Sequence, residues 1–301
     1  MGINRALVVS NWEMAKECLT THDKVFASRP KTLAAEILGY NFSMFGFSPY
    51  GSYWRETRKI ATLELLSNHR LEKLKHVREY EVKTCLKELY QLWDNNKNTN
   101  KMLLVEMKRW LADSIRNVVL RMIVGKGCNS VDSEEWKELL TRFFEMSGKF
   151  VVSDALPFLR WLDIGGDERS MKKIAKELDV VVQGCGTQLF INVWKLQRDP
   201  HVWEEPCKFQ PERFLTRHKD IDVRGQNFEL LPFGSGRRMC PGVSFALQVM
   251  QFTLASLLHG FDIATPSNEP LDMGERLGLT IEKSTPLEVL VSPRLSASLY
   301  G

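Results

Sequence analysis

The order of apolar and polar positions divides the chain into two regions of different character. Up to about residue 184, apolar residues recur at helical spacing almost throughout. A helix is expected to start near Ser52, and Ser10 is expected to cap the first helix. The other predicted helices are Asn11–Leu19, His69–Trp93, Met102–Val124, Asp132–Met146 and Ser170–Val182.

Strand-like runs lie near both ends of the chain. Arg5–Val9 is a short apolar and β-branched run, and helical character stops at residues 184–186 in favour of a predicted strand at Thr187–Val193. Leu277–Ile281 and Leu287–Val291 are expected to pair as a terminal hairpin. The sequence therefore predicts a mainly α-helical fold with small β-sheets.

One helix is more apolar than the rest. Val243–Leu258 has apolar residues on all sides, which predicts burial on several sides, and Gly260 is expected to end the helix. Its polar residues and its length argue against a membrane span. We find no signal peptide or membrane span along the chain.

Composition narrows the class of protein. The chain has 301 residues, is 44% hydrophobic and 26% charged, and carries a formal charge of +4. These values fit one large globular domain or two ordinary ones. Because no dense block of Lys and Arg occurs, nucleic acid is excluded as a partner, whereas the mildly basic balance suits docking of an acidic protein. The six cysteines are far apart without a Cys-x-x-Cys pair, which argues against a disulfide framework and a zinc site.

The stretch Phe233–Gly242 is the most informative part of the sequence. It reads Phe-Gly-Ser-Gly-Arg-Arg-Met-Cys-Pro-Gly and places Cys240 on a glycine-shaped loop before a predicted helix. Glycines allow backbone conformations that side chains forbid, and a helix N-terminus stabilises a thiolate. Such a loop can hold one thiolate against an open face of a metal. The alternative is a buried structural cysteine on a turn.

The pattern Phe-x-x-Gly-x-Arg-x-Cys-x-Gly resembles the haem-binding signature of the cytochrome P450 superfamily. The resemblance implies that Cys240 is the axial ligand of the iron of haem b, within a loop that Gly242 completes. Trp54-x-x-x-Arg58 is similar to the family pair that holds a haem propionate. Arg238 is then expected to serve a propionate too, and Phe233 to pack beside the sulfur.

Other stretches extend the resemblance over nearly the whole chain. Phe209–Phe214 resembles the Pro-Glu-Arg-Phe segment of the family, in which an arginine, here Arg213, joins a Glu-x-x-Arg pair. Residues 192–200 and 278–289 are similar to the plant microsomal members, which implies an enzyme of specialised metabolism. The aromatic loop 40–51 lines a pocket or covers the core. Candidate pocket residues are Phe45, Phe47, Leu279 and Thr280.

Two hallmarks of the family are absent from the sequence. The central helix with its acid and alcohol for proton delivery has no counterpart, because the nearest string, Gly165–Ser170, carries arginine in place of threonine. Glu106–Arg109 has the letters of the Glu-x-x-Arg pair but lies too early, where a helical surface pair explains it. No catalytic residue is therefore identified. A block is expected to be missing between Gly184 and Cys185.

The chain thus resembles an N-terminally short, internally deleted form that comes from alternative splicing or an imperfect gene model. We expect one incomplete cytochrome P450 domain over residues 1–301, with a mostly helical part, 1–184, and a haem-binding part, 185–301. The deletion is expected to expose apolar surface on the remaining helices and to leave Arg213 buried without its carboxylate partner.

The resemblance implies a haem-thiolate monooxygenase. It would oxidise an apolar small molecule with O2 and with electrons from NADPH–cytochrome P450 reductase, on the endoplasmic reticulum membrane, although no anchor is found in the chain. The alternative is a catalytically silent remnant that binds haem weakly or acts only through partner proteins. A third hypothesis is an unrelated all-helical interaction protein with a fortuitous cysteine.

Overall fold

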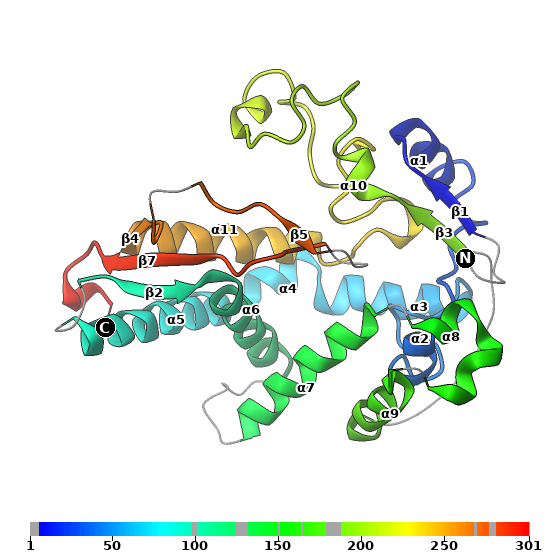
Figure 1. The fold of residues 1–301 in the computed structure, drawn as a ribbon, viewed down its shortest axis with the longest axis horizontal. Coiled ribbons are helices and arrows are strands. Elements are labelled where there is room, and N and C mark those ends of the chain that lie inside the picture. The colour runs from blue at the N-terminus through cyan, green and yellow to red at the C-terminus, as the bar shows by residue number, and fades with distance from the viewer. Residues whose placement is uncertain are drawn as a thin grey trace. The chain divides into compact units, whose positions relative to one another are not determined.

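The computed structural model describes residues 6–97, 101–124, 132–149, 151–163, 165–178, 188–267, 270–276 and 281–300. The fold is mainly helical with small sheets, as predicted (Figure 1). It forms two compact units, each built from two stretches of the chain. The first unit combines Met1–Leu63 with Arg142–Val243, and the second combines Glu64–Thr141 with Ser244–Gly301. The predicted division between residues 184 and 185 lies outside the described residues.

The first unit contains short helices around one pair of strands. Its elements are β1 (Ala6–Val9), α1 (Trp12–Leu19), α2 (Leu33–Ile37), α3 (Ser52–Ile60), α8 (Val152–Ala155), a 3₁₀-helix (Pro157–Leu162), α9 (Asp167–Leu178), β3 (Gln188–Ile191), α10 (Val193–Leu196) and the 3₁₀-turns Pro211–Phe214 and Gly236–Arg238. A π-helical turn (Ala61–Leu65) and α7 (Asp132–Ser147) each run from one unit into the other.

The two stretches of the first unit meet in a parallel strand pair. β1 lies beside β3, with Val9 opposite Ile191 in register. Behind this pair, apolar residues of α1, α10 and the loop before the cysteine turn form one core. Its buried members are Val9, Ala15, Cys18, Leu196, Phe228 and Leu231. The predicted strands therefore exist and bring the start of the chain next to the segment that leads to Cys240.

Two helix starts of the first unit differ from the prediction. Asn11, not Ser10, caps α1, because its side chain accepts the Met14 N–H at 2.9 Å. α9 begins at Asp167, three residues before the predicted Ser170. The Asp163 carboxylate accepts the Glu168 N–H at 2.8 Å and thereby satisfies one of the free donors of the first turn.

The second unit places helices along a three-stranded sheet. Its elements are α4 (Asn68–Lys73), α5 (Lys75–Asn96), β2 (Leu103–Glu106), α6 (Met107–Val124), α11 (Val243–Gly260, from Ser244 in this unit), β4 (Phe261–Ala264), β5 (Glu275–Arg276), β6 (Glu282–Lys283), β7 (Glu288–Pro293) and the 3₁₀-turn Ala297–Leu299. Their core consists of Leu89, Met107, Leu257, Phe261, Val289, Val291 and Tyr300.

The predicted terminal hairpin is wrong. β7 is the central strand of an antiparallel sheet, with β2 on one side and β4 on the other (Figure 1). Leu103–Glu106 is therefore a strand and not the first turn of a helix, since a short apolar run fits either structure by its periodicity. β6 pairs with β5 instead. Residues 277–280 lie outside the described part.

Burial of α11 on several sides is also wrong. Val249, Thr253 and Leu257 are buried, but the next face of the helix is open. Met250, Leu254 and Leu258 are 45%, 53% and 48% exposed, and their spacing of four residues aligns them as one apolar stripe. Among the described residues, α11 is the one helix long and apolar enough to cross a membrane, by length and composition alone.

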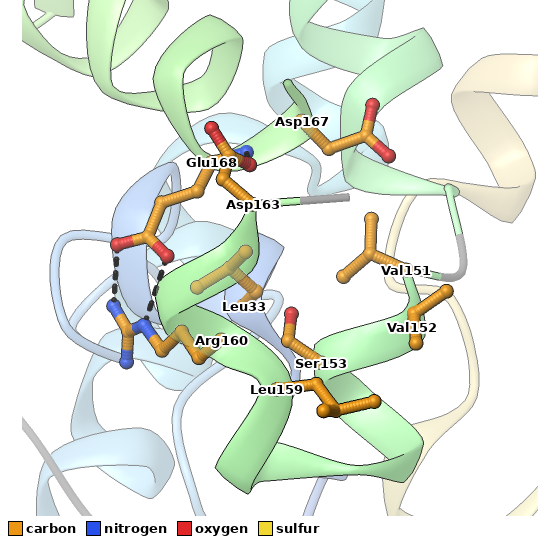
Figure 2. Close-up of a pocket in the computed structure, with 9 residues that line it drawn as sticks. All are labelled: Leu33, Val151, Val152, Ser153, Leu159, Arg160, Asp163, Asp167 and Glu168. Carbon is orange, nitrogen blue, oxygen red and sulfur yellow. Dashed lines mark hydrogen bonds and ion pairs between the residues drawn. The ribbon is translucent and has the colours of Figure 1, made fainter. Parts of the chain in front are cut away.

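A small cavity in the first unit is lined by both apolar and charged side chains and is far too small for a substrate. Figure 2 shows its lining, which encloses about 10 Å³, roughly the volume that one water molecule occupies. Arg160 lies beside it and bonds to Glu168 at 3.0 Å and to Glu36 at 2.8 Å. Glu168, from the Gly165–Ser170 string, is therefore part of an ion-pair network that ties the 3₁₀-helix to α2 and α9.

This network predicts a pH-dependent contribution to stability. Arg160 and Lys172 hold the pKa of Glu168 below its usual value. Glu168→Gln is expected to lower the free energy of unfolding by about 1–3 kcal/mol at pH 7. The stabilisation is present above the unfolded-state pKa of about 4.3 and is lost as the pH falls through the lower folded-state pKa. Urea unfolding of both proteins over a pH series measures this. A difference that stays constant into strong acid contradicts it.

Candidate functional site

The turn that carries Cys240 is closed by backbone geometry. The Cys240 N–H donates to the Phe233 carbonyl oxygen at 2.9 Å. Gly234 and Gly236 have φ of 68° and 63°, a left-handed conformation that favours glycine. A Cβ on Gly236 would also clash with the Leu19 carbonyl oxygen. The turn leaves Cys240 as a free, exposed cysteine, so its sulfur is presented to the outside of the turn and not buried in the core.

Trp54 on α3 is the centre of a cluster of aromatic and cationic side chains. Its side chain is buried, and the Arg238 and Arg58 guanidinium carbons lie 4.4 Å and 5.3 Å from its ring centroid. Phe45 stacks on the indole with centroids 6.4 Å apart, and the Tyr50 ring is tilted against it at 5.5 Å. Trp54 and Arg58 are four residues apart on one helix and therefore lie on the same face, and the tertiary fold brings Arg238 of the turn against the Trp54 ring.

Both arginines also donate hydrogen bonds to backbone carbonyl oxygens and thereby hold the cysteine turn in place. Arg58 donates to the Met239 carbonyl oxygen at 2.6 Å, one residue before Cys240. Arg238 donates to the carbonyl oxygens of Ala27 and Ser48. The cysteine turn is thus tied to α3, to the aromatic loop and to the segment after α1.

The arginines give this cluster a positive charge. Burial, together with the positive charges of Arg29 and Arg58, lowers the pKa of Arg238 to about 10. Burial also lowers the pKa of Arg58, against an opposite effect of Cys240. Arg29 is open to solvent, yet enough protein surrounds it that desolvation lowers its pKa too. No described carboxylate pairs with these three arginines.

A buried donor completes the arrangement. The indole Nε1 of Trp54 has no hydrogen-bond partner among the described residues, although it is fully enclosed. Buried polar groups without a partner are rare and call for an explanation. Three arginines and one free N–H are suited to a dianionic group with carboxylates at its edge, and the exposed sulfur of Cys240 is suited to its metal.

The other predicted site residues are less engaged. Phe233 and Gly242 are half-buried at the two ends of the signature. Phe45 packs on Trp54, and Phe47 lies against Gly39, where a Cβ would come within 2.8 Å of its ring. These contacts give both rings a packing role, and their place in a substrate pocket stays a prediction. Leu279 and Thr280 lie outside the described residues.

Arg213 is not the buried, unpaired charge that we expected. Its side chain is half-buried and donates to the carbonyl oxygens of Gln210, Glu205 and Lys208, at 3.1–3.3 Å. Its own loop therefore supplies neutral acceptors in place of a carboxylate. The Glu106–Arg109 string is likewise a local feature, because the Glu106 carboxylate accepts the Arg109 backbone N–H at 3.3 Å at the start of α6.

Comparison with known proteins decides the family. A cytochrome P450 family model matches residues 1–185 and 179–289. The chain belongs to the cytochrome P450 family. Strychnine-10-hydroxylase of Strychnos nux-vomica is 37% identical over an alignment that covers all of this chain and 84% of the relative. A xanthotoxin 5-hydroxylase of Arabidopsis thaliana, 37% identical over 86% of its length, and a flavonoid-6-hydroxylase of Ocimum basilicum, 35% identical over 84%, are similar too.

The same comparisons confirm that this cytochrome P450 is partial. The alignment with strychnine-10-hydroxylase runs over 444 positions and the chain has 301 residues, which leaves 143 aligned positions without a residue in this chain. The two segments matched by the family model meet at residues 179–185. The sequence predicts the missing block in this same region, between Gly184 and Cys185.

The fold and the cofactor follow from the family. A zebrafish cytochrome P450 solved with abiraterone superimposes with a TM-score of 0.63 at 18% identity, covering 98% of this chain and 95% of that structure, which supports the fold. Haem b is the cofactor of this cytochrome P450, and the cationic cluster with its free indole N–H fits it. Sequence reasoning missed Arg29, since an arginine between Ser28 and Pro30 carries no recognisable pattern.

Proposed function

We propose that this cytochrome P450 holds haem b through the Cys240 thiolate and hydroxylates an apolar small molecule as a monooxygenase. The observation that carries the proposal is the exposed Cys240 on a closed turn, beside three arginines without a described carboxylate partner. Bound to a thiolate, haem b supplies the reductive activation of dioxygen.

The residues of the cysteine turn and of the arginine cluster have different roles in holding the haem. Arg58, Arg238 and Trp54 bind the propionates, with Arg29 as an additional positive charge. Phe233 limits water on the sulfur side, which influences the potential of the metal. Gly242 and the glycines of the turn allow the close backbone approach. The described arginines bind and orient the group, while no described residue is assigned to proton delivery.

The substrate class and the partner are inferred from the relatives. The named relatives hydroxylate strychnine, xanthotoxin and a flavonoid according to their names, and we infer a similarly apolar plant metabolite for this chain. Electrons would come from an NADPH-dependent reductase, whose acidic docking surface suits the mildly basic charge of +4. The endoplasmic reticulum membrane is the proposed location.

A second candidate function is a haem-binding form without turnover. One observation favours it: the chain has no residue at 143 aligned positions, and the family model matches it in two segments that meet near the place where the proton-delivery helix is expected. The cysteine turn and the arginine cluster lie wholly in the described part of the first unit, so the residues proposed to hold the haem do not come from that block. Both functions therefore share the same cofactor site.

Turnover with a reductase separates the two functions. The purified chain, loaded with haem, is mixed with a plant NADPH–cytochrome P450 reductase and a panel of alkaloid, coumarin and flavonoid substrates. The proposed function predicts substrate-dependent hydroxylated product together with NADPH consumption. Haem uptake without any product supports the non-catalytic form, and a complete lack of haem uptake contradicts both.

A further inference from the structure

Three successive residues of the cysteine turn contact one segment, Leu19–Ala27. Gly236 abuts the Leu19 carbonyl oxygen so closely that no Cβ fits there. Arg237 pairs with Asp23, with 2.9 Å between the guanidinium Nε and the carboxylate. Arg238 donates from its Nε to the Ala27 carbonyl oxygen. Each step of one residue along the turn thus corresponds to four residues along Leu19–Ala27, which acts as a platform under the turn.

The Asp23–Arg237 pair is the ionic contact of this platform. The Asp23 side chain is 18% exposed and that of Arg237 is 44% exposed, so the pair is partly shielded from water. The same guanidinium donates to the Tyr50 hydroxyl at 2.9 Å and lies 5.4 Å from the centroid of that ring. Tyr50 in turn packs on Trp54. One charged contact therefore connects the platform, the turn and the aromatic cluster beside the proposed haem edge.

We propose that Asp23, acting through Arg237, is a positioning residue that fixes the turn from which Cys240 is presented. The contact of Asp23 with the turn is its ion pair with the Arg237 guanidinium, and not a contact with the sulfur or with the proposed propionate donors. Its consequence for haem ligation rests on the proposed function, whereas its effect on the turn does not. All contacts of the platform lie within the first unit and involve described residues.

Hydrogen exchange of the haem-free protein tests the positioning directly. Asp23→Asn and Arg237→Gln are each expected to speed exchange of the Met239 and Cys240 amides about three- to tenfold, as loss of one partly shielded ion pair predicts. The double variant is expected to be no faster than either single variant. The amide of Asn192, which donates to the Val9 carbonyl oxygen at 2.7 Å, is expected to stay unchanged as an internal reference.

A matched control removes an ion pair of the second unit, which does not contain the turn. Asp262→Asn breaks the pair with Arg294, whose charged atoms are 2.8 Å apart in the second unit, and is expected to leave the turn amides unchanged. Unchanged turn exchange in Asp23→Asn overturns the proposal. Equally accelerated exchange at Asn192 also overturns it, because Asp23 would then stabilise the whole unit and not the turn.

The haem-loaded protein provides a second readout. Asp23→Asn and Arg237→Gln are expected to lower the fraction of the reduced carbon monoxide complex with thiolate-type absorbance, and Arg237→Lys is expected to restore it by keeping the charge. If the unmodified chain takes up no thiolate-ligated haem, the proposed function fails while the exchange result stands. A local exchange effect without a change in the thiolate fraction overturns the role of Asp23 in ligation.

Discussion

Inserting the aligned block of a relative between Gly184 and Cys185 is expected to cover the apolar stripe of α11. Met250, Leu254 and Leu258 are each about half exposed, and full burial of a large apolar side chain contributes about 1.5–3 kcal/mol. The stripe alone is then expected to add about 2–4 kcal/mol to the free energy of unfolding. Urea unfolding and binding of a hydrophobic dye measure the change.

A flexible linker of equal length is the control for this insertion. A Gly/Ser linker supplies no apolar surface and is expected to leave dye binding high and stability unchanged or lower, since a longer loop costs entropy. The insertion is also expected to bring turnover, because it supplies the central helix with the proton-delivery pair that this chain lacks. If the stripe of α11 still binds the dye after the relative's block is inserted, the missing block is not what covers the stripe.

Cys240→Ser is expected to weaken haem binding by about a hundredfold or more, because a serine hydroxyl is not ionised at neutral pH and is a poor replacement for a soft thiolate. Titration of the haem-free proteins with haem measures this. Cys207→Ser is the matched control, since Cys207 is also a free, exposed cysteine but lies outside the turn. Equal affinity of Cys240→Ser and the unmodified chain contradicts the role of Cys240.

The parts of the site that lie close together in sequence are the parts that sequence reasoning found. Cys240, Arg238 and Gly242 stand within five residues, and Trp54 and Arg58 within one helical turn. Residues this close in sequence are neighbours through the local backbone alone, so a sequence pattern can reveal them. The recognised pattern and the closed turn therefore agree.

Contacts between distant segments were not predictable in the same way. Arg29, Asp23 and Tyr50 reach the cysteine turn from about 190–215 residues earlier in the chain, and each is an ordinary polar residue of a loop. The partners of β7 illustrate the same limit. Periodicity identifies a strand but says nothing about which strand lies beside it, so the neighbouring run at Leu287–Val291 was paired wrongly.

The exposure of α11 has another cause. Its composition is that of a helix covered on several sides, and the prediction of burial follows correctly from that composition. The chain lacks 143 positions that a relative carries, and the stripe is open in the structure. The apolar pattern of α11 is that of a helix in a complete fold. This chain keeps that pattern but lacks part of the fold.

The absorption spectrum of the reduced protein with carbon monoxide tests the central claim most directly. The chain is expressed with haem available, purified, reduced and exposed to carbon monoxide. The account predicts a red-shifted Soret band typical of thiolate ligation that is absent in Cys240→Ser and retained in Cys207→Ser. An imidazole-type band in the unmodified chain, or a thiolate-type band that survives Cys240→Ser, would contradict it.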